Sequence, residues 1–453
     1  MPLQSEDTIY ALSSGRLPAA IAIVRISGGR ARIGLETLVG KVPEPRRAVR
    51  GIFRDPLSGA VIDDGLALWF AGPASETGED VAELHLHGGR AVVAAVFRVL
   101  GGLEGFRPAE AGEFTRRALL NDKLDLAAVE GLGDLVAAET EAQRRQAMAQ
   151  FRGALSAKVE AWRGRLVQVM ARLEAGIDFS DEGDVPDDLL RPAVEIARAL
   201  ATEIRAVLVD APRGERLREG FVVAIAGPPN VGKSTLLNRL AERDVAIVSA
   251  IPGTTRDAIE VALDLKGVPV VLVDTAGVRE SKDPIELEGV KRALARAASA
   301  DLVLWLTEAG GPSPAPPPGT RAIMVRTKAD LVDADLVDAD LVDSVAQRCL
   351  QDKESISISA KTGVGMERLL DFLAHEAEKL GGEPALVTRE RQRHALVEAL
   401  TRLETALDIA ATGKEELVAE ELRMAANALG RVTGRIGVEE VLGEIFRSFC
   451  IGK

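Results

Sequence analysis

The segment GPPNVGKS, from Gly227 to Ser234, has the residue types and spacing of a loop that binds phosphate groups. Its glycines let backbone N–H groups turn towards the phosphates, Lys233 supplies a cation to the outer phosphates, and the Ser234 hydroxyl can bind Mg²⁺. A β-rich run, FVVAIA, precedes the segment, and a helical run, TLLNRL, follows it. A glycine-rich turn that only caps a helix is the alternative. The motifs further along the chain favour a nucleotide phosphate site between a strand and a helix.

Three of these motifs come at the ends of predicted strands. In DTAG (Asp274 to Gly277) the carboxylate can hold the magnesium shell, and the Gly277 N–H can meet the terminal phosphate. In TKAD (Thr327 to Asp330) the final carboxylate can accept hydrogen bonds from the guanine edge, which adenine does not offer. The third, SAK, runs from Ser359 to Lys361. Alone, TKAD and SAK would fit solvated loops, but in this order the motifs resemble a GTPase.

A GTPase with these motifs would need a catalytic group other than the usual glutamine. Val278 follows DTAG, where many GTPases carry a glutamine that orients the attacking water. Because valine cannot orient water, hydrolysis needs another polar group, and the charge of the transition state needs a cation. Asn230 and the run SAIPGTTRD (249–257) offer side-chain and carbonyl oxygens. Hard oxygen ligands beside the phosphates predict a site for a monovalent cation.

The elements that must position these motifs fall into four segments. Residues 1–120 alternate β-rich and helical runs, which predicts a small α/β domain. In 121–217 apolar residues recur at intervals of three or four, from Phe151 to Leu173, as on one face of a long helix. In 218–378 strands and helices alternate, which predicts a parallel, doubly wound sheet, and helical spacing returns in 379–453. We therefore expect one helical domain interrupted in sequence by an inserted α/β unit.

Composition sets broader limits. At 453 residues, with 47% apolar and 28% charged residues, the chain should form two to four domains. It shows no targeting signal and no apolar run of about 20 residues, and only two cysteines, so we expect a cytoplasmic protein without a membrane span. A formal charge of −13 argues against a surface that holds nucleic acid by phosphate neutralisation alone. Any RNA would need a local basic patch or a partner.

Along essentially its whole length the chain resembles the MnmE (TrmE) family of tRNA-modification GTPases. The resemblance rests on DTIYALSSG, IAIVRISG, LHLHGG, AGEFTRRALLNDKLDLAAVEG, IDFSDEGD, GTTRD, DTAGVRE and the closing FCIGK. It implies an N-terminal α/β domain that binds folate and dimerises, and a helical domain interrupted by a Ras-like P-loop GTPase domain.

The resemblance also implies the reaction. With an FAD-dependent partner of the MnmG type, in a heterotetramer or larger complex, the homodimer would add an aminomethyl or carboxymethylaminomethyl group to carbon 5 of the wobble uridine of certain tRNAs. The one-carbon unit would come from a tetrahydrofolate derivative, the 5-formyl or methylene form. Potassium would promote GTPase-domain dimerisation and GTP hydrolysis.

Site residues carry over from the family position by position. Potassium would be held by Asn230, Ser249, Ile251 and Thr254, and magnesium by Ser234 and Thr255, while Glu286 would position the attacking water. The family often has Thr where Ser249 stands and has Asn where Thr327 stands. The full GTP site would comprise Asn230, Val231, Gly232, Lys233, Ser234, Thr235, Ser249, Ala250, Ile251, Pro252, Gly253, Thr254, Thr255, Asp274, Thr275, Ala276, Gly277, Thr327, Lys328, Asp330, Ser359, Ala360 and Lys361.

A second site is implied in the N-terminal domain. A family-like folate site would use Arg25, Glu83 and Lys123. A carboxylate can accept paired hydrogen bonds from a pterin, and the two cations can face acidic or carbonyl groups of the cofactor. In the family the closing FCIGK points to this site, so Lys453 could meet the cofactor and Cys450 could take part in the chemistry. We expect the tail to dock through Phe446 and Phe449, with a tight bend at Gly452.

Two other functions compete with tRNA modification: a ribosome-assembly GTPase that binds RNA directly, and a folate-dependent one-carbon transferase regulated by GTP. The first would be expected to add a basic RNA-binding module, whereas this chain is acidic and ends in a helical domain. Folate turnover without a flavoprotein would identify the second. His85 and His87 share one strand face, but without a third ligand we interpret them as structural.

Overall fold

The computed structural model of the chain divides into two units, each of which contains one β-sheet. Unit 1 combines residues 1–133, 150–197 and 401–453, and unit 2 combines 134–149 and 198–400. The residues described are 7–178, 190–228, 230–243, 245–247, 260–274, 300–311, 315–316, 321–331, 355–412, 414–436, 445–446, 449 and 451–452, with the backbone alone at 175–178 and 190. Within them, no helix is long and apolar enough to cross a membrane.

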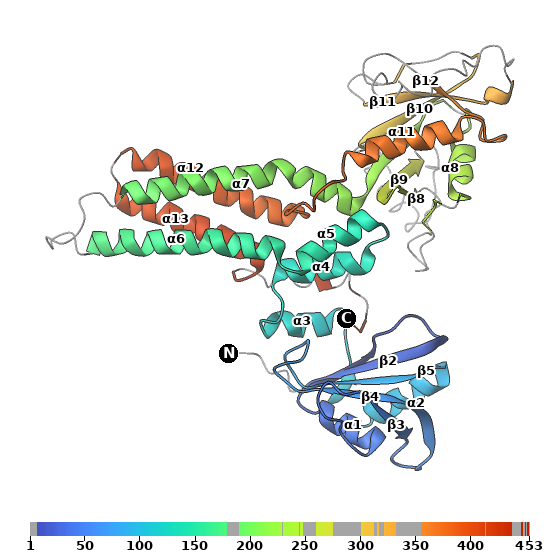
Figure 1. Ribbon diagram of the computed structural model, residues 1–453, viewed down its shortest axis with the longest axis vertical. Coiled ribbons are helices and arrows are strands. Elements are labelled where there is room, and N and C mark those ends of the chain that lie inside the picture. Colours follow the sequence, from blue (N-terminus) through green and yellow to red (C-terminus); the bar gives the residue numbers. More distant parts are fainter. Residues whose placement is uncertain are drawn as a thin grey trace, which may run out of the picture. The chain divides into compact units, whose positions relative to one another are not determined.

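Unit 1 begins with a six-stranded sheet, ordered β3-β4-β5-β2-β1-β6. Neighbouring strands are antiparallel except for β1 and β6. Helices α1 (Ala31–Val39) and α2 (Arg90–Gly101) bury Leu35 and Val96 against the sheet, which confirms the predicted small α/β domain (Figure 1). The strands are β1 (Thr8–Leu12), β2 (Ala19–Ser27), β3 (Val49–Arg54), β4 (Val61–Phe70), β5 (Val81–Gly88) and β6 (Phe106–Pro108).

Helices complete unit 1. After α3 (Glu113–Leu120) and α4 (Leu126–Ala137), the long α6 (Ala154–Asp178) packs beside α13 (Glu415–Thr433), as Figure 1 shows. These two helices lie on opposite sides of the second sheet in the sequence. Their contact therefore supports a helical domain interrupted by an insertion.

The prediction that one long helix carries the whole apolar stripe is wrong at Phe151, where the stripe begins. Helix α5 (Glu141–Phe151) ends there, and α6 begins only at Ala154. Gly153 lies between them with φ +81°, a left-handed conformation that glycine adopts readily and that ends a helix. The rest of the stripe is buried on α6, namely Leu155, Val159, Trp162, Leu166, Val169 and Leu173.

Unit 2 contains a second six-stranded sheet, ordered β12-β11-β10-β7-β9-β8. Five strands are parallel, as predicted, but β8 runs antiparallel to β9. Lys266 (φ +53°) and Gly267 (φ +83°) form the tight turn that makes this hairpin. The strands are β7 (Phe221–Ala226), β8 (Glu260–Leu265), β9 (Val268–Asp274), β10 (Leu302–Glu308), β11 (Ala322–Thr327) and β12 (Ser355–Ser357).

Helices α8 (Lys233–Ala241) and α11 (Met366–Glu378) contribute Leu236 and Leu369 to the core of this sheet. The chain enters the sheet from α7 (Leu190–Glu219) and leaves it towards α12 (Glu390–Ala410). Arg213 on α7 donates hydrogen bonds to the carbonyls of Leu380, Gly381 and Glu383. The entering and leaving segments are therefore side by side, as an insertion requires.

Candidate functional site

The predicted phosphate loop joins β7 to α8. Gly227 has φ +147°, and a Cβ there would lie 2.4 Å from the Leu306 carbonyl oxygen, so only glycine fits. Gly232 (φ +98°) caps α8, and Asn230 at the loop tip has φ +59°. The N-terminal N–H groups of α8 consequently open onto the loop, which is the backbone arrangement that binds phosphate.

Lys233 is the cation of this loop. Its buried side chain donates from Nζ to the carbonyl oxygens of Gly227 and Pro228, at 2.8 Å each. These bonds hold the ammonium group over the loop, at the positive end of α8. The ammonium group is therefore already held in place before a phosphate binds beside it.

At the predicted magnesium site, two oxygens from different elements meet. The Ser234 hydroxyl on α8 donates to Oδ2 of Asp274, 3.2 Å away, at the end of β9. Asp274 is buried, so its carboxylate is oriented by the strand. A hydroxyl and a carboxylate oxygen are donors that Mg²⁺ prefers, and the residues therefore fit this ion.

Thr327, where the family has Asn, ties the phosphate loop to the sheet. Its buried hydroxyl donates to the carbonyl of Val231, at 2.6 Å, and lies 3.2 Å from that of Thr307. The contact joins the end of β11 to the phosphate loop, 96 positions earlier in the chain. This hydroxyl therefore braces the loop from the side of the predicted base site.

Asp330 and Ser359 meet at the predicted base site. The Ser359 hydroxyl donates to Oδ1 of Asp330 at 2.6 Å, and this hydrogen bond is the main cause that lowers the pKa of the Asp330 carboxyl. Lys361 adds a smaller electrostatic contribution in the same direction. The carboxylate therefore stays ionised at neutral pH and can accept hydrogen bonds from a base.

The remaining residues of the predicted GTP site divide into two groups. Val231 and Gly232 lie in the loop, Thr235 is exposed on α8, Lys328 forms an ion pair with Glu308 at 2.9 Å, and Ala360 lies beside Ser359. The second group lies outside the described residues: Ser249, Ala250, Ile251, Pro252, Gly253, Thr254, Thr255, Thr275, Ala276, Gly277 and Glu286.

In unit 1, the predicted folate residues Arg25 and Glu83 are cross-strand partners on β2 and β5. Arg25 Nε donates to Glu83 Oε1 at 3.0 Å, and a second guanidinium nitrogen lies 3.0 Å from Glu76. The other oxygen of Glu83 lies 3.5 Å from Nε2 of His85, a buried nitrogen without a hydrogen-bond partner. A ligand here would share Glu83 with Arg25. Lys123, exposed after α3, is not brought to this pair by any contact among the described residues.

The C-terminal tail docks on the same domain, as predicted. Ile451 forms an antiparallel bridge with Ala111, and Gly452 adopts φ +101° against Leu12 of β1. A Cβ on Gly452 would lie 2.2 Å from the Leu12 carbonyl oxygen, so a larger residue does not fit. Strand β1 pairs directly with β2, which carries Arg25. The tail therefore contacts the strand that neighbours the predicted folate strand. Cys450 and Lys453 themselves lie outside the described residues.

The anchoring rings of the tail are placed as expected. Phe446 and Phe449 lie with their ring centroids 5.8 Å apart. A Cβ on Gly112 would lie 2.8 Å from the Phe446 ring, and one on Gly133 would lie 3.1 Å from the Phe449 ring. The two glycines thus leave room for the rings against α3 and α4.

Sequence reasoning missed Arg117, which fixes α3 on the sheet. This buried side chain donates to Glu79 at 2.8 Å and to the carbonyl of Asp7 at 3.0 Å. It also lies 3.3 Å from Glu113. Burial raises the pKa of Glu113, but the hydrogen bonds from Arg107 and the Glu110 N–H, together with the charges of Arg107 and Arg117, outweigh it and lower the pKa, so the carboxylate remains charged. The only signal in the sequence was an arginine within AGEFTRRALL, because its partners Glu79 and Asp7 lie far away in the chain.

Known proteins resemble the chain over its whole length. The family described as GTP-binding protein TrmE N-terminus matches residues 8–123, and MnmE helical domain matches 126–450. Proteins named tRNA modification GTPase MnmE are 56% identical in Azorhizobium caulinodans and 55% in Bradyrhizobium sp. (strain ORS 278). The alignments cover 99% of this chain and 100% and 99% of those proteins. The solved structure of Aquifex aeolicus Era with GDP and aluminium fluoride is 28% identical over 40% of this chain and 66% of that one, with a TM-score of 0.25.

Proposed function

Because the chain belongs to the MnmE family of tRNA-modification GTPases, we propose that it hydrolyses GTP to drive the modification of tRNA. The observation that carries the proposal is one continuous site in unit 2. Phosphate groups would lie on the loop at Lys233, magnesium between Ser234 and Asp274, and guanine at Asp330. Each contact comes from the carboxyl end of a parallel strand or the loop after it, where such sheets bind ligands.

The site favours GTP over ATP for a chemical reason. The ionised Asp330, oriented by Ser359, offers acceptors to the N–H groups on the guanine edge. Adenine lacks that pair of donors and would forfeit these hydrogen bonds to the carboxylate. Lys233 and the α8 N-terminus stabilise charge on the phosphates as the bond to the terminal phosphate breaks.

We propose that potassium completes the catalytic site. Val278 has no group that orients water, and Asn230 lies at the loop tip with an amide oxygen available as a ligand. Ser249, Ile251 and Thr254 would supply further oxygens, Thr255 would join Ser234 on magnesium, and Glu286 would position the water. Potassium would stabilise transition-state charge and promote dimerisation of the GTPase domains.

This proposal is tested by GTP hydrolysis in potassium and in sodium chloride at equal ionic strength. We expect a much faster rate in potassium, and loss of that stimulation in Asn230→Ala, which keeps Lys233 and Ser234. Arg144→Ala, an exposed change on α5, is the matched control. Equal rates in both salts would rule out the potassium mechanism but not GTP hydrolysis itself.

We also propose that unit 1 binds a tetrahydrofolate derivative, the 5-formyl or methylene form. Glu83 would accept hydrogen bonds from the pterin, and Arg25 and Lys123 would face its acidic or carbonyl groups. The orphaned Nε2 of His85, buried beside Glu83, fits a site that a polar ligand would complete. The folate would supply the one-carbon unit, while the docked tail would bring Lys453 to the cofactor and Cys450 to the edge of the site.

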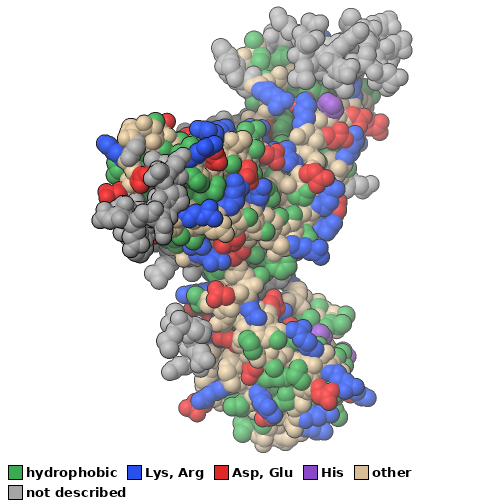
Figure 2. Space-filling model, turned by 60° about the vertical axis from the view of Figure 1, so that its left-hand side comes forward, with side chains coloured by type: hydrophobic (Ala, Val, Ile, Leu, Met, Phe, Trp, Pro, Cys, Tyr) green, Lys and Arg blue, Asp and Glu red, His purple; other side chains and the backbone are tan. Residues whose placement is uncertain are grey.

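The full reaction then needs a partner. We propose that a homodimer acts in the cytoplasm with an FAD-dependent protein of the MnmG type to place an aminomethyl or carboxymethylaminomethyl group on carbon 5 of the wobble uridine. On the face in Figure 2, Lys and Arg side chains are interspersed with Asp and Glu. A net charge of −13 with mixed surface charge favours tRNA binding shared with that partner.

A further inference from the structure

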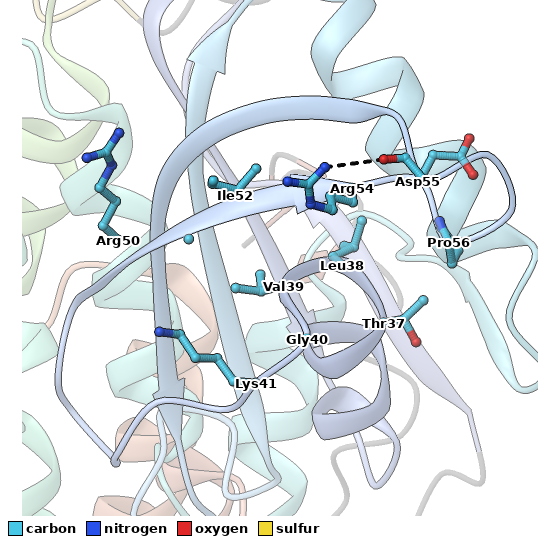
Figure 3. Close-up of a pocket in the computed structure, with 12 residues that line it drawn as sticks. Thr37, Leu38, Val39, Gly40, Lys41, Arg50, Ile52, Arg54, Asp55 and Pro56 are labelled. Carbon is cyan, nitrogen blue, oxygen red and sulfur yellow. Dashed lines mark hydrogen bonds between the residues drawn. The ribbon is translucent and has the colours of Figure 1, made fainter.

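Strand β3 is an outer strand of the sheet in unit 1, and within the described part of the chain it pairs only with β4. In such a strand, the N–H and C=O groups of every second residue point away from the neighbour and can pair with another strand. A cavity of about 680 Å³ runs along this edge (Figure 3). Its walls are β3, the end of α1 at residues 37–41, and the turn at 55–59.

The floor of this groove is apolar because α1 ends directly against the strand. A Cβ on Gly51 would lie 2.6 Å from Val39, so glycine permits the close approach. Leu38 is buried beneath the groove, while Ile52 is 44% exposed along it. The edge therefore offers apolar surface next to its backbone groups.

The charges along the groove are not balanced within it. Arg50 is already paired with Asp64 on β4. The Asp55 carboxylate lies 4.0 Å from the guanidinium of Arg98, outside the groove, and accepts hydrogen bonds from the backbone N–H groups of Leu57 and Ser58. The other two cations that line the groove are Lys41 and Arg54.

Arg54 donates to the Gly59 carbonyl at 3.3 Å, and neither it nor the exposed Lys41 has an acidic partner among the described residues. Figure 3 shows Arg54 on the strand and Lys41 after the end of α1. Among the described residues the groove thus carries two cations without an ion-pair partner, in a chain whose net charge is −13.

We propose that this β3 groove is a docking site for an extended acidic segment of a partner protein, which adds to the sheet as a further strand. Backbone pairing supplies the affinity, and alternate side chains reach the apolar floor and the cations. An RNA strand would neutralise the charges but leave the backbone edge unpaired. A second copy would bring Arg50 and Arg54 against the same residues of its partner, and like charges placed opposite each other in a sheet are unfavourable.

The probe is a fluorescein-labelled peptide of alternating valine and glutamate, titrated with the full-length protein by fluorescence anisotropy. We expect saturable binding that weakens as salt is added. Lys41→Glu and Arg54→Glu should each weaken it about twofold to thirtyfold, because each replaces an exposed attraction by a repulsion. Arg32→Glu, on exposed α1 outside the groove, is the matched control and should bind normally.

Two further probes separate strand addition from simple charge attraction. A peptide with N-methyl groups on alternate residues keeps its charge but loses backbone donors, and we expect it not to bind. The proposal is overturned if both charge reversals bind as the wild type does, or if the N-methylated peptide binds equally well. It is also overturned if a 20-nucleotide RNA displaces the peptide and its binding is weakened by the same two charge reversals. A change of oligomeric state in the charge-reversal variants would overturn it as well, because it would identify the groove as an interface between copies of the chain.

Discussion

Thr327→Val tests whether the contact between β11 and the phosphate loop supports nucleotide binding. The substitution removes one hydroxyl, which donates to Val231 at 2.6 Å inside the protein, and it barely changes the side-chain volume. A buried carbonyl left without its donor costs about 1–3 kcal/mol. If the substitution destabilises the GTP-bound conformation of the loop by this amount and leaves the free protein unaffected, GTP binding weakens about 5- to 150-fold.

The assay is a fluorescence titration with a labelled GTP analogue, together with thermal unfolding of the free protein. Thr327→Ser keeps the hydroxyl and is the matched control, so it should bind close to the wild type. If the valine variant binds GTP as tightly as the serine variant, the hydroxyl does not brace the loop and the argument from this contact is refuted.

Three further predictions concern the other contacts of the two units. Asp330→Asn should weaken GTP binding and relax discrimination against XTP in competition titrations, because an amide NH2 donor replaces one of the two carboxylate oxygens. Unchanged affinities for both nucleotides would show that TKAD does not read the base. Gly452→Ala should release the tail from Leu12 and abolish tRNA modification while GTP hydrolysis stays near normal, and modification at the wild-type level would separate the tail from the folate site. The Asp63 carboxylate raises the pKa of the His87 imidazole through the hydrogen bond between them. The pair therefore stabilises the folded protein fully below about pH 6.5, the unfolded pKa of histidine, and this stabilisation is lost as the pH rises through the pKa of His87 in the folded protein. An NMR titration should show this pKa falling in Asp63→Asn, and an unchanged value would assign the shift elsewhere.

The phosphate loop could be predicted from sequence because its chemistry is local. Gly227, Gly232 and Lys233 stand within one short segment, and the structure places that segment between β7 and α8 as expected. The inserted arrangement of the α/β unit was also predictable, because the helical spacing returns after it. Patterns of this kind can be read from neighbouring residues because those residues alone determine the local structure.

Contacts between distant residues could not be predicted in the same way. The register of β2 against β5 makes Arg25 and Glu83 cross-strand partners, and no local pattern specifies that register. Arg117 and Thr327 likewise bind groups far away in the chain. The break at Gly153 was missed because an apolar stripe can continue across two helices when one residue turns the chain.

The central claim is that GTP hydrolysis at this site serves wobble-uridine modification. The most direct measurement is mass-spectrometric nucleoside analysis of bulk tRNA from cells that lack the protein and carry either the wild type or Ser234→Ala. Loss of the Ser234 hydroxyl would remove one of the proposed magnesium ligands. We predict that the aminomethyl-type substituent on carbon 5 of the wobble uridine disappears without the protein, returns with the wild type, and stays absent with Ser234→Ala. An unchanged nucleoside profile in cells without the protein would contradict the proposed function.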